Sequence, residues 1–475
     1  MALTRISFHD PEGSMFALGG RVLRRVSEAG ARRLRNFLAS AIAAELTAES
    51  LLTRTVELTE AEANELSGIS SSGSDRSAVW FEHERVAFQS YAHEWVPEML
   101  LEAADLTLSL ARRLHRANWD LKDAAASNVL FVGSRPIFVD LCSFVERAPD
   151  EPYWWPKGQF ERHFLLPLLA YVYRGVSPAA PHLLDSDGLS HEDAFRLFAA
   201  EKWIRPTVIR HCTLPFLLNR GRSAPVHFGR GATADPRTSS VAQDWQTRSL
   251  AKSLERIRRT LPRPRSAWQE YSEDRPHYSP GQVASKHRIV GEWLSELAPR
   301  AVLDLGANTG EFTAMAAAKG AMVVAIEGDL AAARLCYRRI RDENLPAVVL
   351  LQNVARPAPA LGWRNAEKLS LNQRLDGSFD CVMALALLHH LVASAAIPPS
   401  EIVDQMANLT TGALIIEHVA PTDPMFVTLE RQRRLDHSWL TLERFSELLK
   451  RRFRIVRSEE IVPGQRTLLL CDRLK

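Results

Sequence analysis

The sequence predicts an α/β protein in which an α+β region precedes a larger, mainly parallel sheet. Three observations support this prediction. A chain of 475 residues is too long for one hydrophobic core, which favours two or three domains. A polar, irregular segment separates an aromatic-rich region from one in which apolar strands and helical patterns alternate. We therefore predict domains at 1–225 and 268–475, joined by a linker at 226–267.

The alternation in the C-terminal domain is regular enough to assign its elements in order. The expected strands cover 301–305, 322–327, 347–353, 379–387, 413–419, 453–461 and 466–474, and the expected helices cover 283–297, 311–320, 330–344 and 444–453. Strands that are apolar throughout are typical of a parallel sheet covered by helices on both faces. We expect a Rossmann-like sheet of seven strands that binds its ligand at the carboxyl ends of those strands.

The stretch AVLDLGANTGEF (301–312) follows the first of these strands into a turn and a helix. Gly306 and Gly310 lack a Cβ, so the turn can be sharp and its backbone can approach a ligand. Asp304 ends the strand and Glu311 opens the helix, where a dinucleotide would place its negative pyrophosphate. The turn also lacks the G-x-G-x-x-G pattern. A nucleoside ligand with a positive centre and no phosphate fits better, and S-adenosylmethionine is such a ligand.

Polar residues at the next strand ends agree with this ligand. Glu327 closes the second strand, where a carboxylate can accept hydrogen bonds from both ribose hydroxyls. Asn353 closes the third strand and can bond the adenine edge. The segment LALLHHL (385–391) follows the fourth strand and can pack against the adenine. Each signal alone is common, but four in order at successive strand ends favour an S-adenosylmethionine site.

Residues 268–475 therefore resemble the class I S-adenosylmethionine-dependent methyltransferases, with VLDLGANTG (302–310) in place of their glycine-rich first motif. Asn308 stands where the family usually has glycine. The resemblance implies that Asp304, Gly306 and Gly310 contact the methionine portion of the cofactor, while Glu327 holds the ribose and Asn353 the adenine.

The segment WQEYSEDRPHYSPGQVASKHRIV (268–290) resembles the lid helix of this family. Tyr278 and Lys286 are the candidates there for closing over the cofactor. The other interpretation of this segment is a surface helix with an aromatic staple.

Methyl transfer needs no covalent nucleophile from the protein, but an oxygen or ammonium acceptor must lose a proton. Histidines and a glutamate follow the fourth and fifth strands, at the edge where a general base would lie: His389, His390, Glu417 and His418. We select His390 and Glu417. The alternative for the paired histidines is that one packs inside and the other caps a helix. No pattern of cysteine and histidine indicates a metal site, and the methyl acceptor is not defined.

The N-terminal stretch NWDLKDAAASNVLFVGSRPIFVDLCSF (118–144) contains three residues, Asp120, Asn128 and Asp140, that resemble the catalytic-loop Asp, metal-binding Asn and DFG Asp of protein-kinase-like folds. The interval from Asp120 to Asn128 is three residues too long, and DLC replaces DFG. No lysine precedes Lys122 to meet ATP phosphates. These departures favour a degenerate, non-catalytic kinase-like module that recognises a substrate or partner.

Two further motifs, SYAHEW (90–95) and LKDAAASN (121–128), resemble a group of bacterial methyltransferases that includes nodulation proteins. This resemblance covers nearly the whole chain and implies methyl transfer to a glycan or small metabolite. Two alternatives remain open: a bifunctional protein whose N-terminal half is an active phosphotransferase, and a non-enzymatic scaffold that binds S-adenosylmethionine.

Composition and charge indicate the partners and the compartment that we expect for this protein. A net charge of +3 gives no electrostatic case for nucleic acid or an anionic membrane. The longest apolar run, FLLPLLAYVY (164–173), is too short to span a bilayer. The N-terminus lacks the apolar stretch of a secretory signal, and the five cysteines are scattered. We expect a cytoplasmic protein and make no prediction of its oligomeric state.

Overall fold

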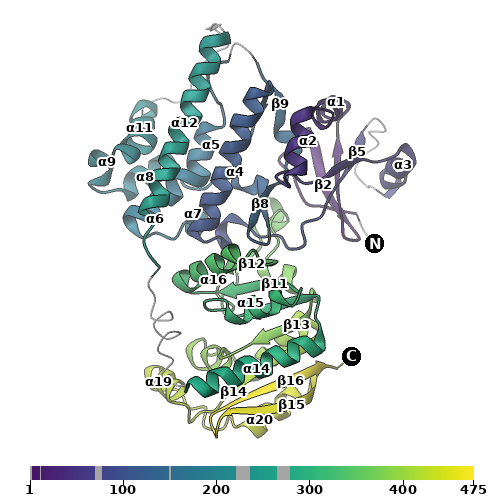
Figure 1. Cartoon of the computed structure of the whole chain (residues 1–475), viewed down its shortest axis with the longest axis vertical. Coiled ribbons are helices and arrows are strands. Elements are labelled where there is room, and N and C mark those ends of the chain that lie inside the picture. The colour runs from purple at the N-terminus through teal and green to yellow at the C-terminus, as the bar shows by residue number, and fades with distance from the viewer. Residues whose placement is uncertain are drawn as a thin grey trace. The chain divides into compact units, whose positions relative to one another are not determined.

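The computed structural model describes residues 3–10, 12–69, 78–148, 151–220, 236–264 and 279–474 (Figure 1). The chain divides into two compact units. Unit 1 comprises Met1–Phe131, Pro136–Pro262 and Ala360–Lys368, and unit 2 comprises Val132–Arg135, Arg263–Pro359 and Leu369–Lys475. Among the helices that are described, none is both long and apolar enough to cross a bilayer.

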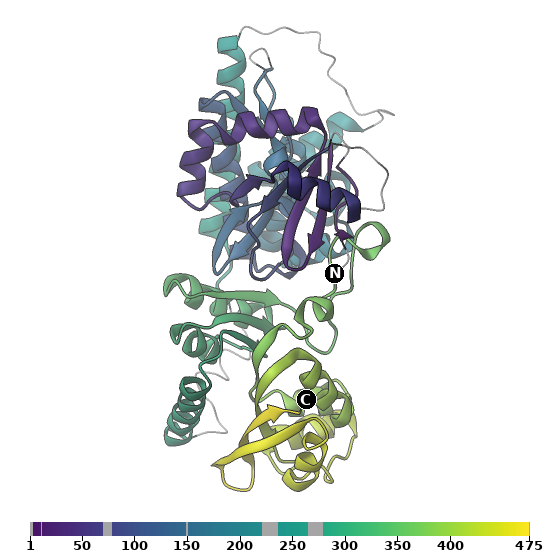
Figure 2. The same cartoon turned by 90° about the vertical axis from the view of Figure 1, so that its right-hand side faces the viewer.

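Unit 2 is built on a seven-stranded sheet, which confirms the predicted number of strands. The strands are β10 (Ala301–Leu305), β11 (Met322–Glu327), β12 (Ala347–Leu351), β13 (Phe379–Ala384), β14 (Thr410–Val419), β15 (Phe453–Val462) and β16 (Arg466–Arg473). Their order is β12-β11-β10-β13-β14-β16-β15. The first five pair in parallel, and β16 is antiparallel to both β14 and β15. The yellow β15–β16 hairpin is clearest in Figure 2.

The helices of unit 2 form two groups. They are α14 (Pro280–Leu297), α15 (Glu311–Ala318), α16 (Leu330–Asp342), α17 (Leu371–Leu375), α18 (Pro399–Leu409), α19 (Pro424–Arg433) and α20 (Leu442–Leu449). α14 contacts α15 and α15 contacts α16, while α18 contacts α20. α14 begins at a capping box, in which Ser279 and Gln282 satisfy each other's backbone N–H groups, followed by Pro280 in the first turn.

The sheet of unit 1 has five antiparallel strands in the order β1-β2-β3-β5-β4. Its strands and their helices are β1 (Thr4–Arg5), β2 (Gly13–Leu18), β3 (Arg21–Val26), α1 (Glu28–Leu38), α2 (Ala41–Ala48), β4 (Thr55–Glu57), α3 (Glu60–Ile69) and β5 (Val79–His83). Phe16 and Leu23 from this sheet pack with Leu66 of α3 and with Trp80 in one buried cluster. This mixture of strands and helices agrees with the expected α+β class.

The rest of unit 1 is mainly helical. Its elements are α4 (Pro97–Arg116), β6 (Trp119–Leu121), β7 (Val129–Val132), β8 (Arg135–Phe138), β9 (Phe144–Glu146), α5 (Lys157–Phe160), α6 (Leu166–Arg174), α7 (Ala179–Leu184), α8 (His191–Leu197), α9 (Glu201–Ile204), α10 (Pro206–Val208), α11 (Leu214–Asn219) and α12 (Pro236–Thr260). β6 pairs with β9, and β7 pairs with β8. The segments Glu161–Leu165 and Ile209–Thr213 are π-helical.

The segment expected to be a linker is different in the structure. Helix α12 occupies most of 226–267, contacts α4 and α6, and belongs to unit 1. Leu250, Leu254 and Ile257 are buried on one face. The same buried face continues through Gln243 and Thr247. Polar residues on a buried face weaken the apolar periodicity of a helix, which is why the sequence indicated a polar linker here.

A buried carboxylate in unit 1 ties three segments together. Glu161 is 1% exposed and accepts hydrogen bonds from Lys157 Nζ (2.6 Å), His191 Nε2 (3.2 Å) and His211 Nδ1 (2.7 Å). His211 Nε2 lies 3.0 Å from Ser253 Oγ on α12. Although burial opposes ionisation, these hydrogen bonds and charges hold the pKa of Glu161 far below its ordinary value.

We predict that Glu161→Gln lowers the free energy of unfolding of unit 1 by about 1–3 kcal/mol, because the buried amide cannot accept all three hydrogen bonds that Glu161 accepts. The exposed Glu192→Gln, which breaks an Arg196 pair, is the control and should cost under about 1 kcal/mol. Chemical denaturation of the full chain measures both. Since the folded pKa of Glu161 is depressed, its contribution is present above about pH 4.3 and is lost as the pH falls. An unchanged difference between wild type and Glu161→Gln at pH 3 would contradict this assignment.

Candidate functional site

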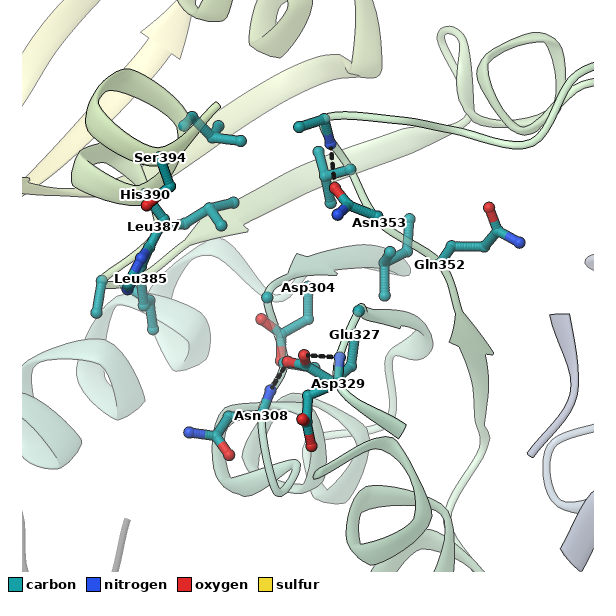
Figure 3. A pocket seen from close by; sticks show the side chains of 18 of the residues that line it. Asp304, Asn308, Glu327, Asp329, Gln352, Asn353, Leu385, Leu387, His390 and Ser394 are labelled. Atoms are coloured by element: carbon teal, nitrogen blue, oxygen red, sulfur yellow. Dashed lines mark hydrogen bonds between the residues drawn. The ribbon is translucent and has the colours of Figure 1, made fainter. Parts of the chain in front are cut away.

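A cavity of about 530 Å³ lies in unit 2 at the carboxyl ends of β10, β11, β12 and β13. A cavity of this size suits a ligand of drug or nucleoside dimensions. Its polar lining residues are Lys286, Asn308, Thr309, Arg356, His390, Ser394 and Arg433 together with Asp304, Glu311, Glu327, Asp329, Gln352 and Asn353. Figure 3 shows Leu385, Leu387, His390 and Ser394 grouped together, apart from Glu327 and Asp329.

The turn after β10 uses the left-handed backbone region three times. Gly306 has φ 71°, Asn308 φ 50° and Gly310 φ 80°. Asparagine tolerates this region better than most residues, which explains how it replaces the glycine expected at position 308. A Cβ at Gly310 would lie 2.6 Å from Cys336 Sγ, so this glycine is required by packing as well as by φ. Gly310 shapes the turn and is not one of the residues that line the cavity.

Asp304 and Glu327 place two carboxyl groups at the cavity. Asp304 is 3% exposed and accepts a hydrogen bond from Thr313 Oγ1 at 2.6 Å. Burial, reinforced by the charge of Glu327, raises the pKa of Asp304 to about 6. Burial also raises the pKa of Glu327. A cationic ligand group would lower the pKa of both carboxyls, whereas a pyrophosphate would be repelled by them.

Glu327 also fixes the two loops around it. Its Oε2 accepts from the Asn308 backbone N–H at 2.8 Å, and its Oε1 accepts from the Asp329 backbone N–H at 2.7 Å (Figure 3). Each carboxylate oxygen has a second lone pair, so this arrangement leaves acceptor capacity for a ligand hydroxyl.

The loop after β12 provides the next polar pair. Asn353 Oδ1 accepts from Ala355 N at 2.9 Å, and Gln352 Oε1 accepts from Ala358 N at 3.1 Å. These bonds fix both amide groups at the cavity. Sequence reasoning identified Asn353 but missed Gln352 and Asp329. Asp329 caps α16 through Ala332 N, a signal that was available in the sequence as an acid preceding a helical pattern.

Lys286 lines the cavity as expected, but Glu417 does not. Glu417 is fully buried, and its Oε2 accepts from Lys286 Nζ at 2.6 Å and from the Ala386 backbone N–H at 2.9 Å. This corrects the expectation that Glu417 is a general base, because its carboxylate lies behind the cavity wall in an ion pair. Tyr278, the other expected lid residue, lies outside the described residues.

The three candidate histidines lie in different surroundings. His390 lines the cavity at the start of the π-helical segment His390–Ser394, and burial lowers the pKa of this imidazole to about 4. His389 is buried and packs edge-on against Phe426 of α19. His418 is buried and its Nε2 lies 3.1 Å from Leu440 O. The structure therefore brings His390 to the cavity and places the other two in the core.

Unit 1 contains a second polar cluster, around Asp140. Arg24 on β3 is 5% exposed and bonds both Asp140 and Asp10. Although burial opposes ionisation, the charge of Arg24 holds the pKa of Asp140 below its ordinary value. Asp140 Oδ2 also accepts from Ser143 Oγ, which contacts Asn128 Nδ2.

Asp120, the aspartate that the sequence singled out, has other partners. Asp120 lies on β6, where it accepts from the Leu121 backbone N–H and lies 3.8 Å from His115. Burial raises the pKa of Asp123; the charge of Lys122 opposes this shift, and the charges of Asp140 and Asp10 add to it. The spacing from Asp123 to Asn128 within LKDAAASN also has the length of the kinase catalytic loop.

Comparison with known proteins agrees with the geometry of unit 2. Residues 303–411 match the family model of a methyltransferase domain. The chain thus contains a methyltransferase domain, and such domains typically depend on S-adenosylmethionine. Across its length it is similar to the nodulation protein NoeA of Rhizobium meliloti (strain 1021), with 27% identity over 471 residues, 98% of this chain and 95% of that protein. The chain is therefore related to the nodulation proteins.

Two solved structures have a lower sequence identity to this chain than NoeA has. WbdD aligns over 42% of this chain and 42% of its own, with 22% identity and a TM-score of 0.31. Magnesium protoporphyrin IX methyltransferase (ChlM) from Synechocystis PCC 6803, solved with bound SAH, aligns over 41% of this chain and 84% of its own, with 19% identity and a TM-score of 0.30.

The tight contact at Gly310 predicts a specific sensitivity. We expect Gly310→Ala to lower the free energy of unfolding by more than the about 1–2 kcal/mol that a left-handed alanine costs, because the new Cβ also meets Cys336 Sγ. Gly320→Ala is the matched control, since Gly320 has φ 92° and open space around its Cβ position. Thermal and chemical unfolding of both variants measure the difference. Equal losses would show that backbone strain alone acts at position 310.

Proposed function

We propose that the chain is an enzyme that transfers a methyl group from S-adenosylmethionine to an acceptor bound at the cavity of unit 2. One observation carries this proposal: four neighbouring strands, β10 to β13, are followed by residues that line one cavity. The match of residues 303–411 to a methyltransferase domain supports it independently.

The lining residues fit this cofactor by chemistry. The Asp304 carboxylate suits the ammonium group of the methionine portion, and the Glu327 oxygens suit the ribose hydroxyls. Asn353 offers an amide to the adenine edge, and Leu385 and Leu387 supply an apolar surface for its ring. When bound, S-adenosylmethionine supplies the activated methyl group.

The chain's own contribution is then positioning. Alignment of an acceptor with the methyl group can supply roughly 7–11 kcal/mol of barrier reduction. His390 is the residue that we assign to the acceptor's proton, because it lines the cavity and its lowered pKa keeps it neutral near pH 7. An imidazole with so low a pKa accepts the proton only while the methyl group is being transferred, because the acceptor becomes more acidic at that stage. We propose an oxygen or ammonium acceptor, in a glycan or a small metabolite.

For unit 1 we propose a kinase-like recognition module without phosphotransferase activity. The position of Arg24 supports this proposal. Its guanidinium is held by Asp140 and Asp10, so it is not available to neutralise ATP phosphates while these bonds persist. Asp140 is likewise engaged by a cation, where a phosphotransferase would use it to bind Mg²⁺.

Calorimetric titration of the full chain with S-adenosylhomocysteine tests the proposed function. We expect binding to the unsubstituted chain, and at least tenfold weaker binding to Glu327→Ala, because that change removes the ribose acceptor and releases both loops. NAD should not bind. A parallel titration with ATP and Mg²⁺ tests unit 1, for which we expect no binding. Failure of S-adenosylhomocysteine to bind the unsubstituted chain would overturn the proposal.

The pKa of Asp304 predicts a pH dependence for the same binding. Since burial raises this pKa to about 6, Asp304 is protonated in the empty site at pH 5 and ionised at pH 7.5. An ammonium group prefers the ionised form, so S-adenosylhomocysteine affinity should rise as the pH passes through about 6. The sign is the reverse of the effect on folding, because ionising a buried carboxyl destabilises the empty protein. Asp304→Asn should remove most of this dependence. An unchanged pH profile in that variant would assign it to another group.

A further inference from the structure

Glu417 does not line the cavity, yet its carboxylate reaches two groups that do: the backbone of Ala386 and the ammonium of Lys286. We infer that Glu417 is a positioning residue for methyl transfer, which fixes both of these groups at the cavity wall. This inference rests on the proposed function of unit 2.

The first of these groups is strained. Ala386 follows β13 and has φ 50°, in the left-handed region that residues with a Cβ rarely adopt. Such a conformation persists only when its surroundings enforce it. The Ala386 N–H donates to Glu417 Oε2 at 2.9 Å, a bond to a charged and fully buried acceptor. Glu417 therefore holds the Leu385–Ala386 peptide in place. Leu385 and Leu387, on either side of Ala386, both line the cavity.

The second group is a buried cation. Lys286 is 8% exposed and belongs to α14, which precedes the sheet, whereas Glu417 belongs to β14 near the end of it. Their ion pair of 2.6 Å therefore links helix and sheet beside the cavity. Glu417 thus fixes the position of the Lys286 ammonium, which can attract an anionic ligand group at the cavity.

Glu417 also lies close to a second buried cation, Arg466. Arg466, fully buried at the start of β16, lies 3.9 Å from Glu417 Oε1 and donates through Nε to Asp423 Oδ2 at 2.8 Å. Asp423 caps α19, which contacts the π-helical segment that begins at His390. Lys286, Glu417, Arg466 and Asp423 therefore alternate in sign, with no net charge. Burying charged groups costs free energy. This row of four charges ends on both sides at elements of the cavity wall, and that arrangement fits a positioning role.

A general-base role does not fit the same geometry. A base must reach the acceptor's proton within hydrogen-bonding distance. The Glu417 carboxylate is 0% exposed and is in contact with Lys286 and Ala386 instead. Its effect on the reaction must then pass through those two groups, which gives the experiment two separate arms.

The first arm uses Ala386→Gly as a second background. Glycine adopts φ 50° without strain, so it needs less help from Glu417. We expect Glu417→Ala to weaken S-adenosylhomocysteine binding by about tenfold to a hundredfold in the unsubstituted background, and by only a few-fold in the Ala386→Gly background. Calorimetric titration of the full chain measures all four proteins. A purely structural role predicts the same loss in both backgrounds, and that result would overturn the inference for Ala386.

The second arm compares two ligands. S-Adenosylhomocysteine carries an amino-acid carboxylate, and 5′-methylthioadenosine lacks it. Because Lys286 suits an anion, both Glu417→Ala and Glu417→Gln should weaken the first ligand at least several-fold more than the second. Equal losses for the two ligands would overturn the inference for Lys286.

Controls separate these outcomes from unfolding and from failure of the proposed function. Glu296→Ala, which breaks an exposed pair with Arg457, should leave both affinities unchanged. If Glu417→Ala does not fold, the second arm is carried by Glu417→Gln alone, since the amide oxygen still accepts from Ala386 N while the charge facing Lys286 is lost, and the first arm is then made in the same two backgrounds with Glu417→Asp, whose shorter side chain cannot reach Ala386 N in the same way. No binding to the unsubstituted chain would overturn the proposed function itself. Binding that Glu417 variants leave intact would overturn only the positioning role.

Discussion

The parallel pairing of β10 with both β11 and β13 is the constraint on which the site depends. Asp304 lies opposite Ala325 on one side and Met383 on the other, so all three strands end at the same edge of the sheet. Residues that follow each strand then meet without long excursions of the chain. A shift of one residue in either pairing would turn Asp304 to the other face, because side chains alternate along a strand.

Charge at this edge is arranged in two layers. Asp304 and Glu327 face the cavity, and burial raises the pKa of both carboxyls. Behind the wall, Glu417 is neutralised by Lys286 and approached by Arg466. Carboxyl groups on different strands of one sheet thus have opposite electrostatic surroundings. The carboxyls at the cavity are available to a ligand, whereas the carboxylate behind it is already committed to the protein.

Much of unit 2 could be predicted because its strands are continuous apolar runs that end in polar residues. Asp304, Glu327 and Asn353 were predictable for the same reason. Glu417 was not, because a carboxylate at a strand end gives the same sequence signal whether it faces the cavity or lies behind it. The packing of helix α12 against α4 and α6 was not predicted, because Gln243 and Thr247 occupy its buried face. Arg433 gave no signal at all, since it reaches the cavity from a helix that follows the fifth parallel strand.

The two hydrogen bonds of Glu327 have an evolutionary consequence. Both donors, at Asn308 and Asp329, are backbone N–H groups, so the bonds do not depend on which side chains those positions carry. Mutational drift in either loop can therefore proceed without disturbing the carboxylate, provided that the backbone conformation is kept. Asparagine at position 308 is compatible with this arrangement, because the bond to Glu327 uses only its backbone N–H.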